Sequence, residues 1–268
     1  METISGKTSL IGLLGQPVSH SLSPAMHNAA LREMGIDWCY LAMPCEAKYL
    51  IKAIEALGYL NCKGLNITIP YKNKAINACN EITPLAKELG AINTLIPNSD
   101  QSWKGTNTDV EGFISPLRDK NLKNKKSLVL GSGGSARAVI AGLQKLKIKE
   151  IIVIGRNQDS LQNLIQAIET NKKSKTTIKG IHKDAKELHE YIDTSDIIIN
   201  TTPVGMRTDK GSKDNIPLGF DIWKYLKKNT ILYDLIYTPA LTPWLQLGGN
   251  YGCSQINGIE MLVQQGAS

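Results

Sequence analysis

The chain has 268 residues, 42% of them hydrophobic and 21% charged, which is typical of a soluble α/β protein and long enough for two domains. No apolar run approaches the ~20 residues of a membrane span, and the opening residues lack a signal-peptide pattern, so we expect no membrane association. The net charge is +7, but the lysine clusters at 120–126 and 171–175 contain no aromatic residues for stacking on bases, so nucleic-acid binding is not indicated.

The first predicted strand covers residues 9–15 and ends in a glycine. A polar loop that contains Ser21 and Ser23 leads from this strand into a helix. Pro24 suits the first helical turn with Ser23 as N-cap, so capping is an alternative explanation of Ser23. Ser21 has no such structural explanation, and two hydroxyls in one loop indicate contact with an anion or a polyol.

A strand with alternating polar and apolar side chains is predicted between Gly64 and Lys72. One face carries Leu65, Ile67 and Ile69, and the other face carries Asn66 and Thr68. Pro70 ends the strand just before Lys72. Two short polar side chains with an ammonium beyond them are typical of a pocket wall, and a solvated edge strand is the alternative.

The next motifs place polar residues where strands pass into helices. Asn93 lies among apolar residues, and Thr108 and Asp109 directly precede an expected helix. Thr108 or Asp109 could simply cap that helix. The junction also lies just before a second domain, and clefts between domains are favoured ligand sites. Further elements are expected as a strand at 37–43 and helical segments near 46–57, 73–80 and 84–89.

The segment 127–157 reads as a strand, a glycine turn, a helix and a second strand, which together make one βαβ unit. In its G-x-G-x-x-A pattern, Gly131 permits the tight turn, Gly133 lets the backbone approach a pyrophosphate, and Ala136 keeps the helix close to the strand. The helix then directs free N–H groups and its positive end at the phosphates. The pattern predicts dinucleotide binding, and an ordinary turn is the alternative.

The residue after the second strand of this unit bears on the choice of dinucleotide. An NAD site usually has Asp or Glu there to hold the ribose 2′-hydroxyl, whereas this chain has Arg156. A guanidinium can stack on adenine and bind a 2′-phosphate through two parallel hydrogen bonds. Arg156 therefore favours NADP, and a solvated charge at a strand end is the alternative.

The last part of the chain continues the alternation of strands and helices. A buried strand near 197–200 runs into a polar loop, which places Thr202 beside the cofactor. Another strand is expected at 231–237. Tyr237 could be a core aromatic residue, but its position at the strand end, close to Pro239, favours the cleft. A final helix ends the chain.

The spacing of cysteine and histidine residues gives no sign of a metal site. The five cysteines are odd in number and include no C-x-x-C pair, and the four histidines lack ligand spacing with them. Reduced thiols are typical of cytoplasmic proteins, so we expect a cytoplasmic location.

Seven short motifs follow one another along nearly the whole chain. They are Ser-His-Ser-Leu-Ser-Pro (19–24), Asn-Ile-Thr-Ile-Pro-Tyr-Lys (66–72), Gly-Ala-Ile-Asn-Thr (90–94), Asn-Thr-Asp (107–109), Gly-Ser-Gly-Gly-Ser-Ala-Arg (131–137), Tyr-Asp-Leu-Ile-Tyr (233–237) and Met-Leu-Val-Gln-Gln (261–265). The same motifs occur in the same order in the shikimate dehydrogenase family, which this chain therefore resembles. Seven motifs in register are far more specific than any one of them.

The resemblance implies an α/β fold with an N-terminal α/β substrate domain and a Rossmann-like, doubly wound nucleotide-binding domain. The substrate-binding and catalytic domain would comprise residues 1–109 with 258–268, and the NADP-binding domain would comprise 110–257. The implied activity is reversible reduction of 3-dehydroshikimate to shikimate by NADPH, in the biosynthesis of chorismate and aromatic amino acids. The implied partners are these small molecules, and we expect a monomer or a homodimer.

The family's functional residues map onto this chain motif by motif. The resemblance implies that Lys72 and Asp109 are the catalytic pair. It assigns the substrate carboxylate to Ser21, Ser23 and Tyr237, the substrate hydroxyls to Asn66, Asn93, Asp109 and Gln265, and a place in the same pocket to Thr68. It assigns the cofactor to Gly131, Ser132, Gly133, Gly134, Ser135, Arg156, Asn157, Thr202, Leu235 and Gly258.

The implied catalytic pair also makes chemical sense. Hydride transfer to a ketone leaves alkoxide character on the oxygen, so a proton must arrive with the hydride. Lys72 can give that proton or polarise the carbonyl, and Asp109 can orient the ammonium. General acid–base help of this kind typically contributes ~10²–10⁴-fold in rate. We therefore expect folding to bring the two groups together, facing a reduced nicotinamide.

Three departures from the family pattern bear on selectivity and length. Ser160 stands where a second base often accompanies Arg156, which weakens selectivity for NADP. Thr106 stands where the family often has an acidic residue. Family members usually continue through a further helix that contains aromatic residues, so a truncated chain stays an alternative to a natural end at Ser268.

Two other functions stay open. Within the same class, the enzyme would accept quinate or use NAD as well as NADP. In a different class, the chain would be a non-catalytic NADP-binding sensor on the same fold, although intact Lys72 and Asp109 argue against that role. Turnover assays with both substrates and both cofactors separate these functions.

Overall fold

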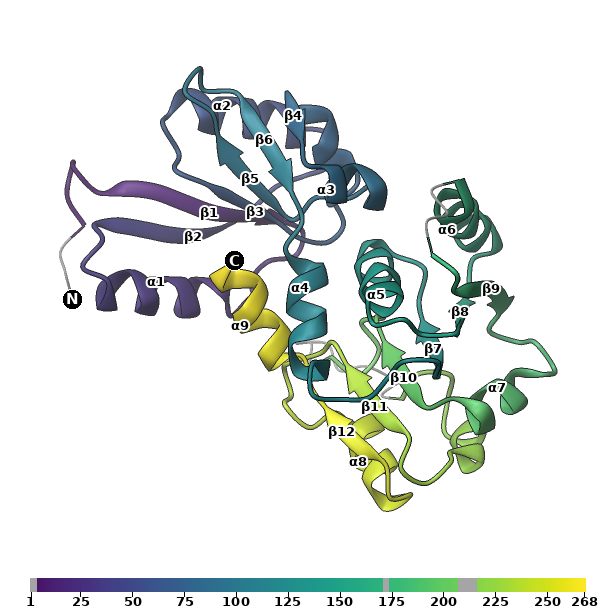
Figure 1. The fold of residues 1–268 in the computed structure, drawn as a ribbon. Helices are drawn as coiled ribbons and strands as arrows, with labels where there is room; N and C mark the ends of the chain where they lie inside the picture. The colour runs from purple at the N-terminus through teal and green to yellow at the C-terminus, as the bar shows by residue number, and fades with distance from the viewer. Residues whose placement is uncertain (1–3, 171–173, 207–215) are drawn as a thin grey trace. The chain divides into compact units, whose positions relative to one another are not determined.

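The computed structural model describes residues 4–170, 174–206 and 216–268 (Figure 1). The chain divides into two compact units, Met1–Thr108 with Ser268, and Asp109–Ala267. Among the described residues, each unit contains one six-stranded sheet. The mixed α/β class predicted from the sequence is confirmed.

The first unit has a sheet of mixed strand direction. Its strands are β1 (Ser9–Gly15), β2 (Trp38–Pro44), β3 (Leu65–Ile67), β4 (Glu81–Ile82), β5 (Thr94–Pro97) and β6 (Trp103–Thr106), in the order β2-β1-β3-β5-β6-β4. The β2-β1-β3 half is parallel, whereas β5 runs antiparallel to both of its neighbours. The helices are α1 (Ser23–Glu33), α2 (Leu50–Tyr59) and α3 (Pro84–Leu89), with a short 3₁₀ helix at Lys74–Ala78.

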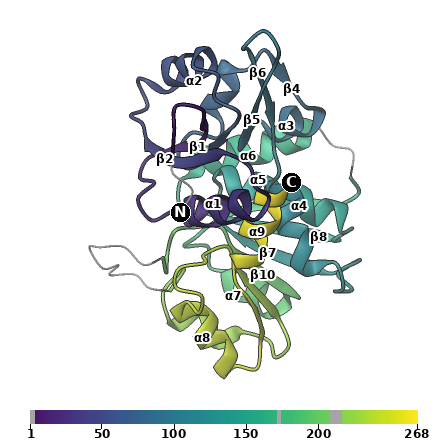
Figure 2. The ribbon, with the colours of Figure 1, turned by 90° about the vertical axis from the view of Figure 1, so that its left-hand side faces the viewer.

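The side chains of β3 point to opposite faces of this sheet, as the alternating sequence predicts. Leu65 and Ile67 are buried in a core that includes residues of α2. On the other face, α1 covers a smaller core around Tyr40, and Asn66 faces that side. Helices α1 and α2 therefore lie on opposite faces of the sheet (Figures 1 and 2). The prediction was wrong for Ile69, which is 58% exposed because β3 ends at Ile67.

The second unit has a sheet whose described strands all pair in parallel. They are β7 (Lys126–Leu130), β8 (Glu150–Gly155), β9 (Thr177–His182), β10 (Ile197–Asn200), β11 (Ile231–Asp234) and β12 (Ser254–Ile256). Their order is β12-β11-β10-β7-β8-β9, which is the doubly wound Rossmann order. The helices are α4 (Asp109–Ile114), α5 (Gly134–Lys145), α6 (Gln158–Thr170), α7 (Leu188–Thr194), α8 (Pro243–Asn250) and α9 (Ile259–Ala267), with 3₁₀ helices at Ser115–Leu117 and Asp221–Tyr225.

Several of these elements were not predicted from the sequence. Strands β9 and β12 are largely polar and partly exposed edge strands, so they lack the apolar run of a buried strand. Helices α7 and α8 were also missed. The strand expected at 231–237 ends earlier, at Asp234. By packing, α9 lies against α4 in the second unit. Its predicted membership of the substrate domain stays a prediction.

Two layers of apolar side chains enclose the second sheet. On one face, the rings of Trp223 and Trp244 lie 5.3 Å apart within a core formed by alternate residues of β7, β8, β10 and β11. On the other face, Phe113 of α4 stacks on Tyr233 of β11 at 5.2 Å. All four rings are fully buried. Burial on both faces explains why the central strands read as continuous apolar runs.

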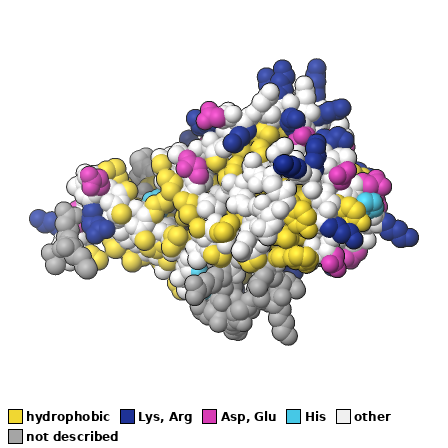
Figure 3. Space-filling model, turned by 90° about the horizontal axis from the view of Figure 1, so that it is seen from below, with side chains coloured by type: hydrophobic (Ala, Val, Ile, Leu, Met, Phe, Trp, Pro, Cys, Tyr) yellow, Lys and Arg dark blue, Asp and Glu magenta, His cyan; other side chains and the backbone are white. Residues whose placement is uncertain are grey.

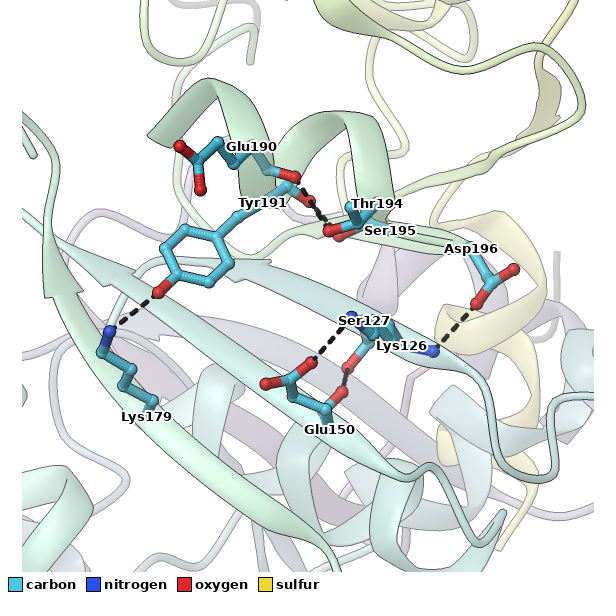
Figure 4. A network of polar contacts seen from close by, with 9 residues as sticks. All are labelled: Lys126, Ser127, Glu150, Lys179, Glu190, Tyr191, Thr194, Ser195 and Asp196. Carbon is cyan, nitrogen blue, oxygen red and sulfur yellow. Dashed lines mark hydrogen bonds and ion pairs between the residues drawn. The ribbon is translucent and has the colours of Figure 1, made fainter. Parts of the chain in front are cut away.

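Polar contacts connect the amino-terminal ends of neighbouring strands of the second sheet, and another contact connects α7 to β9 (Figure 4). The Lys126 ammonium lies 3.4 Å from the Glu150 carboxylate, and the Lys126 backbone N–H donates to Asp196 at 2.9 Å. Lys179 donates to the hydroxyl of Tyr191 at 2.7 Å, and this bond raises the pKa of Lys179. The contacts at Lys126 lie at the opposite end of β7 from the glycine turn.

A completely buried carboxyl group lies at the carboxyl end of β11. Asp234 Oδ1 accepts hydrogen bonds from Asn200 Nδ2 at 3.0 Å and from the Ile236 backbone at 3.1 Å. Its Oδ2 accepts a bond of 2.8 Å from the Thr242 hydroxyl. Since Asn200 ends β10 and Thr242 caps α8, these bonds join two strand ends to a helix start.

We expect Asp234 to make the stability of the second unit depend on pH. Burial raises the pKa of the Asp234 carboxyl from 3.8 to about 6, although its hydrogen bonds act in the opposite direction. Between these two pH values, the folded chain keeps a proton that the unfolded chain releases. The contribution of Asp234 to the free energy of unfolding therefore falls as the pH rises through this range, by on the order of 3 kcal/mol.

The substitution Asp234→Asn removes the ionisable group and should remove this fall. Urea unfolding followed by tryptophan fluorescence, from about pH 4 to about pH 7, compares the variant with the wild type. Asp119→Asn removes an exposed carboxylate of the same unit and should behave as the wild type does. A stability difference between Asp234→Asn and wild type that is constant over this range would contradict the prediction.

Candidate functional site

The glycine turn after β7 has the backbone geometry of a phosphate-binding loop. Gly131 has a φ of +110°, and a Cβ added there would lie 2.5 Å from the Thr201 hydroxyl, so glycine is required. Gly133 has an extended backbone instead, and a Cβ there would meet no described atom within 4 Å. The chain's own packing therefore explains Gly131 but not Gly133, and it leaves open space beside Gly133.

Helix α5 begins at this open space. Gly133 is its N-cap, and among the described residues no side chain caps the helix by a hydrogen bond. The 12-residue helix therefore presents free backbone N–H groups and its positive end at its start. Ala136 is completely buried, which agrees with its expected close packing. The turn from Gly131 to Ser135 fits a pyrophosphate.

The glycine turn also lies at the switch point of the second sheet, where β8 and β10 flank β7. The Thr201 hydroxyl donates to the Leu130 carbonyl at 2.7 Å, which holds the loop after β10 against the turn. The Thr202 hydroxyl donates to Asn200 Oδ1 at 2.7 Å and accepts a bond of 3.3 Å from the Val204 backbone. Thr202, a predicted cofactor contact, thus already stabilises its own loop.

Arg156 and Asn157 follow β8 and are both exposed. Asn157 has a structural role that sequence reasoning did not foresee, because its Oδ1 accepts a bond of 2.8 Å from the Ser160 backbone at the start of α6. This bond is a helix N-cap. The Arg156 carbonyl lies 3.1 Å from His182 Nε2, and the Arg156 residue is exposed.

Leu235 and Gly258, both predicted to lie near the nicotinamide, are brought together by their backbones. The Gly258 N–H donates to the Ile236 carbonyl at 3.0 Å. A Cβ on Gly258 would lie 2.1 Å from the Leu235 carbonyl oxygen, so only glycine fits this approach. The start of α9 is therefore fixed against the residue that follows β11.

The two serines of the first unit lie at the start of α1. Ser21 Oγ accepts a bond of 3.2 Å from the Ser23 backbone N–H, and α1 has no side-chain cap among the described residues. Capping by Ser23 is therefore wrong, and Ser21, which had no foreseen structural role, has this local one. Ser23 is buried, and its side chain hydrogen-bonds to the hydroxyl of Tyr40.

Asn66 and Asn93 belong to one network of hydrogen bonds. Asn66 Nδ2 donates to Thr94 Oγ1 at 3.1 Å and to the Asn93 carbonyl at 3.3 Å. Asn93 Oδ1 accepts from Thr94 Oγ1 at 3.0 Å and from the Thr108 backbone at 2.9 Å. Asn93 Nδ2 donates to Thr108 Oγ1 at 2.9 Å. The network thus extends from β3 to the residue before Asp109.

Thr68 and Lys72 follow β3 in the same unit. The Thr68 backbone N–H donates to the Leu14 carbonyl at 2.9 Å, and the Lys72 carbonyl accepts a bond of 2.9 Å from Ile92. Thr68 and Lys72 are both partly exposed. The main chain on either side of Pro70 is therefore held by backbone hydrogen bonds, while the side chains of Thr68 and Lys72 stay partly exposed.

Asp109, Tyr237 and Gln265 belong to the second unit. Asp109 opens α4 and is only 4% exposed. Gln265 of α9 packs against the same helix, because a Cβ on Gly112 would lie 2.8 Å from the Gln265 Cβ. Tyr237 follows β11 and is half-buried. Lys72 lies in the first unit and Asp109 in the second, so their pairing stays a prediction.

Sequence reasoning missed the residues that hold these groups in place. Tyr40 donates to Asn66, Thr201 holds the loop after β10, and Asn200 and Asp234 join the ends of β10 and β11. A carboxylate at the end of an apolar strand was the signal for Asp234. No local pattern marks Tyr40, because its partner lies 26 residues away.

Three further features concern surface charge, metal ligands and membrane-spanning helices. Lys and Arg side chains are interspersed with Asp and Glu on the face drawn in Figure 3. In the described parts of the chain, no three His, Cys, Asp or Glu side chains are grouped to hold a metal ion. No helix among those residues is both long and apolar enough to cross a membrane.

Comparison with known proteins identifies both parts of the chain. The family model for the shikimate dehydrogenase substrate binding domain matches residues 13–95, and the one for shikimate / quinate 5-dehydrogenase matches residues 116–206. A shikimate dehydrogenase (NADP(+)) from Prochlorococcus marinus (strain MIT 9312) is 51% identical, over 98% of this chain and 91% of its own length.

Solved structures agree with these matches. The shikimate 5-dehydrogenase of Listeria monocytogenes, in complex with shikimate and NAD, is 31% identical with a TM-score of 0.84, over 100% of this chain and 92% of its own. A shikimate dehydrogenase in complex with NADP+ is 34% identical with a TM-score of 0.84, over 99% of this chain and 89% of its own. With both parts of its fold matched in sequence and structure, this chain belongs to the shikimate dehydrogenase family.

Proposed function

We propose that this chain catalyses the reversible reduction of 3-dehydroshikimate to shikimate with NADPH, in the biosynthesis of chorismate and aromatic amino acids. The observation that carries the proposal is the open, uncapped start of α5 at Gly133, in a chain whose other unit matches the family's substrate-binding domain. The relative at 51% identity, named for NADP(+), supports the choice of cofactor.

The proposed division of labour follows the two matches. Residues 110–257 bind NADP, and residues 1–109 with 258–268 bind the substrate. Packing of α9 against α4 supports a role for α9 beside Asp109, because Gln265 lies on that helix face.

NADPH, when bound, supplies the hydride. The turn from Gly131 to Ser135 holds its pyrophosphate through backbone N–H groups, since the open space at Gly133 admits close approach. Arg156 holds the 2′-phosphate, and Leu235 with Gly258 lines the nicotinamide end. Asn157 and Thr202 contribute through the shape of their loops, because their side chains already bond within those loops.

The substrate is held by groups matched to its two ends. Hydroxyl and amide groups suit the carboxylate and the ring hydroxyls, because each can pair with a buried polar atom of the ligand. The carboxylate is assigned to Ser21, Ser23 and Tyr237, the hydroxyls to Asn66, Asn93, Asp109 and Gln265, and a place in the pocket wall to Thr68.

Lys72 is assigned the role of proton donor in the reduction. Its ammonium donates to the carbonyl oxygen that gains negative charge, and in the reverse direction the neutral amine accepts the proton from the hydroxyl. Asp109 is buried at the start of α4, and a carboxylate at a helix N-terminus is favoured by the helix dipole. It orients the ammonium and accepts the substrate's hydroxyl hydrogen bond.

Replacing the proton donor should abolish most of the activity. In Lys72→Ala we expect kcat/KM for 3-dehydroshikimate to fall by ~10²–10⁴-fold, because no group then delivers the proton. The dissociation constant for NADPH should not change, since Lys72 makes no assigned cofactor contact. Consumption of NADPH measures the first quantity, and a fluorescence titration measures the second.

The matched control is Lys74→Ala, which removes an exposed ammonium two residues further along the same segment. It should retain wild-type turnover. If Lys72→Ala turned over substrate as fast as Lys74→Ala, the assignment of the proton donor would be wrong.

Removing the guanidinium after β8 should change the cofactor preference. We expect Arg156→Ala to raise the KM for NADPH by roughly 10- to 100-fold, because a charge-assisted bond contributes about 1.5–3 kcal/mol, and to leave the KM for NADH unchanged. Lys149→Ala removes an exposed cation just before the opposite end of β8 and should alter neither value. Equal losses with both cofactors in Arg156→Ala would rule out a 2′-phosphate contact.

A second candidate is a quinate and shikimate dehydrogenase that uses both NAD and NADP. Two observations favour it: the matched family is described as shikimate / quinate 5-dehydrogenase, and the 31%-identical structure contains NAD. In addition, Ser160 offers no second cation beside Arg156. Values of kcat/KM for the four pairs of substrate and cofactor distinguish the two candidates.

A further inference from the structure

Tyr40 is a fixed hydrogen-bond donor beneath the polar face of the first sheet. It is 1% exposed, and its backbone N–H and carbonyl both bond to the side chain of Asn28 on α1, at 2.8 and 2.9 Å. Its ring stacks on His27, with ring centroids 4.3 Å apart and planes 9° from parallel. The phenol oxygen therefore has one position, from which it donates to Asn66 Oδ1 at 2.8 Å.

Burial favours the protonated form of the Tyr40 hydroxyl, which is the form that donates a hydrogen bond. Burial raises the pKa of Tyr40 above its ordinary value, although the hydrogen bond from Ser23 acts in the opposite direction. A tyrosine in this state donates one hydrogen bond, and here that bond goes to Asn66.

The Asn66 amide has only one orientation that satisfies its neighbours. Both of its N–H bonds are used within the chain, toward Thr94 Oγ1 and the Asn93 carbonyl. A flipped amide would place its oxygen against the Asn93 carbonyl oxygen, and two acceptors repel each other. With Tyr40 on Oδ1, the hydrogen-bonding capacity that Asn66 retains is the second lone pair of that oxygen.

We propose that Tyr40 is a positioning residue of the substrate site: its hydroxyl holds the Asn66 amide so that Asn66 presents an acceptor oxygen, which selects a substrate group that donates a hydrogen bond. A ring hydroxyl fulfils this requirement because it can donate. A carbonyl or carboxylate oxygen at the same place is itself an acceptor, so it would be repelled by Asn66 Oδ1. The inference rests on the proposed function and assigns a residue that the family motifs do not include.

The same bond is the first of a series of hydrogen bonds that continues beyond Asn66. Tyr40 donates to Asn66, Asn66 donates to Thr94, and Thr94 donates to Asn93 Oδ1. The far end of this series is fixed independently, because Asn93 Oδ1 also accepts a bond of 2.9 Å from the Thr108 backbone N–H. Loss of the Tyr40 hydroxyl therefore removes the donor that orients Asn66 Oδ1, while the Asn93 amide keeps its bonds to Thr108.

The test is Tyr40→Phe, which keeps the ring, its stacking on His27 and its place in the core. We expect the KM for shikimate to rise about 10-fold, in line with loss of one orienting hydrogen bond, with a smaller change in kcat and no change in the KM for NADP. The control is Asn28→Ala, which removes the two bonds to the Tyr40 backbone but keeps the hydroxyl, the stacking of the ring on His27 and the pairing of β2 with β1 that hold Tyr40 in place. It should lower the melting temperature at least as much and leave the KM for shikimate within about twofold.

A double-mutant cycle tests whether Tyr40 acts through Asn66. If it does, Tyr40→Phe added to Asn66→Ala should raise the KM no further than Asn66→Ala alone. Additive effects of the two substitutions, an unchanged KM in Tyr40→Phe, or an equal rise in Asn28→Ala would each overturn the inference. A wild-type chain without turnover of shikimate would instead overturn the proposed function itself, so the two failures are distinguishable.

Discussion

Parallel pairing of strands is the constraint on which the arrangement of functional residues depends. In a parallel sheet the carboxyl ends of all strands lie at one edge, and the segments that follow them share that edge. In the second unit, the glycine turn follows β7, Arg156 follows β8, Thr202 follows β10 and Leu235 follows β11. In the first unit, the serine loop follows β1, and Thr68 and Lys72 follow β3, which pairs with β1 in parallel. Within each unit, residues far apart in sequence are thus gathered at one edge of a sheet.

Buried polar groups at these edges are held by two networks of different character. Around Asn66 and Asn93, neutral amides and hydroxyls satisfy one another through hydrogen bonds within the chain. Around Asp234, an ionisable group is buried with three donors, and burial outweighs the hydrogen bonds in setting its pKa. The first network suits recognition of hydroxyl groups. The second joins two strand ends and a helix start, at a cost in stability that depends on pH.

The strand end at Arg156 shows how a departure from the family pattern has a local physical meaning. Asn157 is committed to capping α6 through the backbone of Ser160, and Ser160 carries no charge. In the proposed function, selection for a 2′-phosphate there then depends on the exposed guanidinium of Arg156. Solvent screens such an exposed charge, so its selectivity is smaller than that of a paired, partly buried site.

Features that depend on local pattern could be predicted from the order of residues alone. Apolar alternation indicated the faces of β3, the glycine spacing indicated the turn before α5, and the motif order indicated the family. Each depends on residues within a few positions of one another, where backbone sterics and periodicity act directly. The polar edge strands β9 and β12 escaped prediction for the same reason, because they lack an apolar period.

The pairing of polar groups, in contrast, became known only from the folded chain. Tyr40 meets Asn66 across 26 residues, and Asn200 meets Asp234 across 34, and no short-range pattern encodes either pair. The fold also assigned local roles that composition leaves open, such as Ser21 bonding to the Ser23 backbone and Asn157 capping α6. Hydrogen bonds depend on distance and angle between groups that packing brings together, so the fold selects among the partners that the sequence allows.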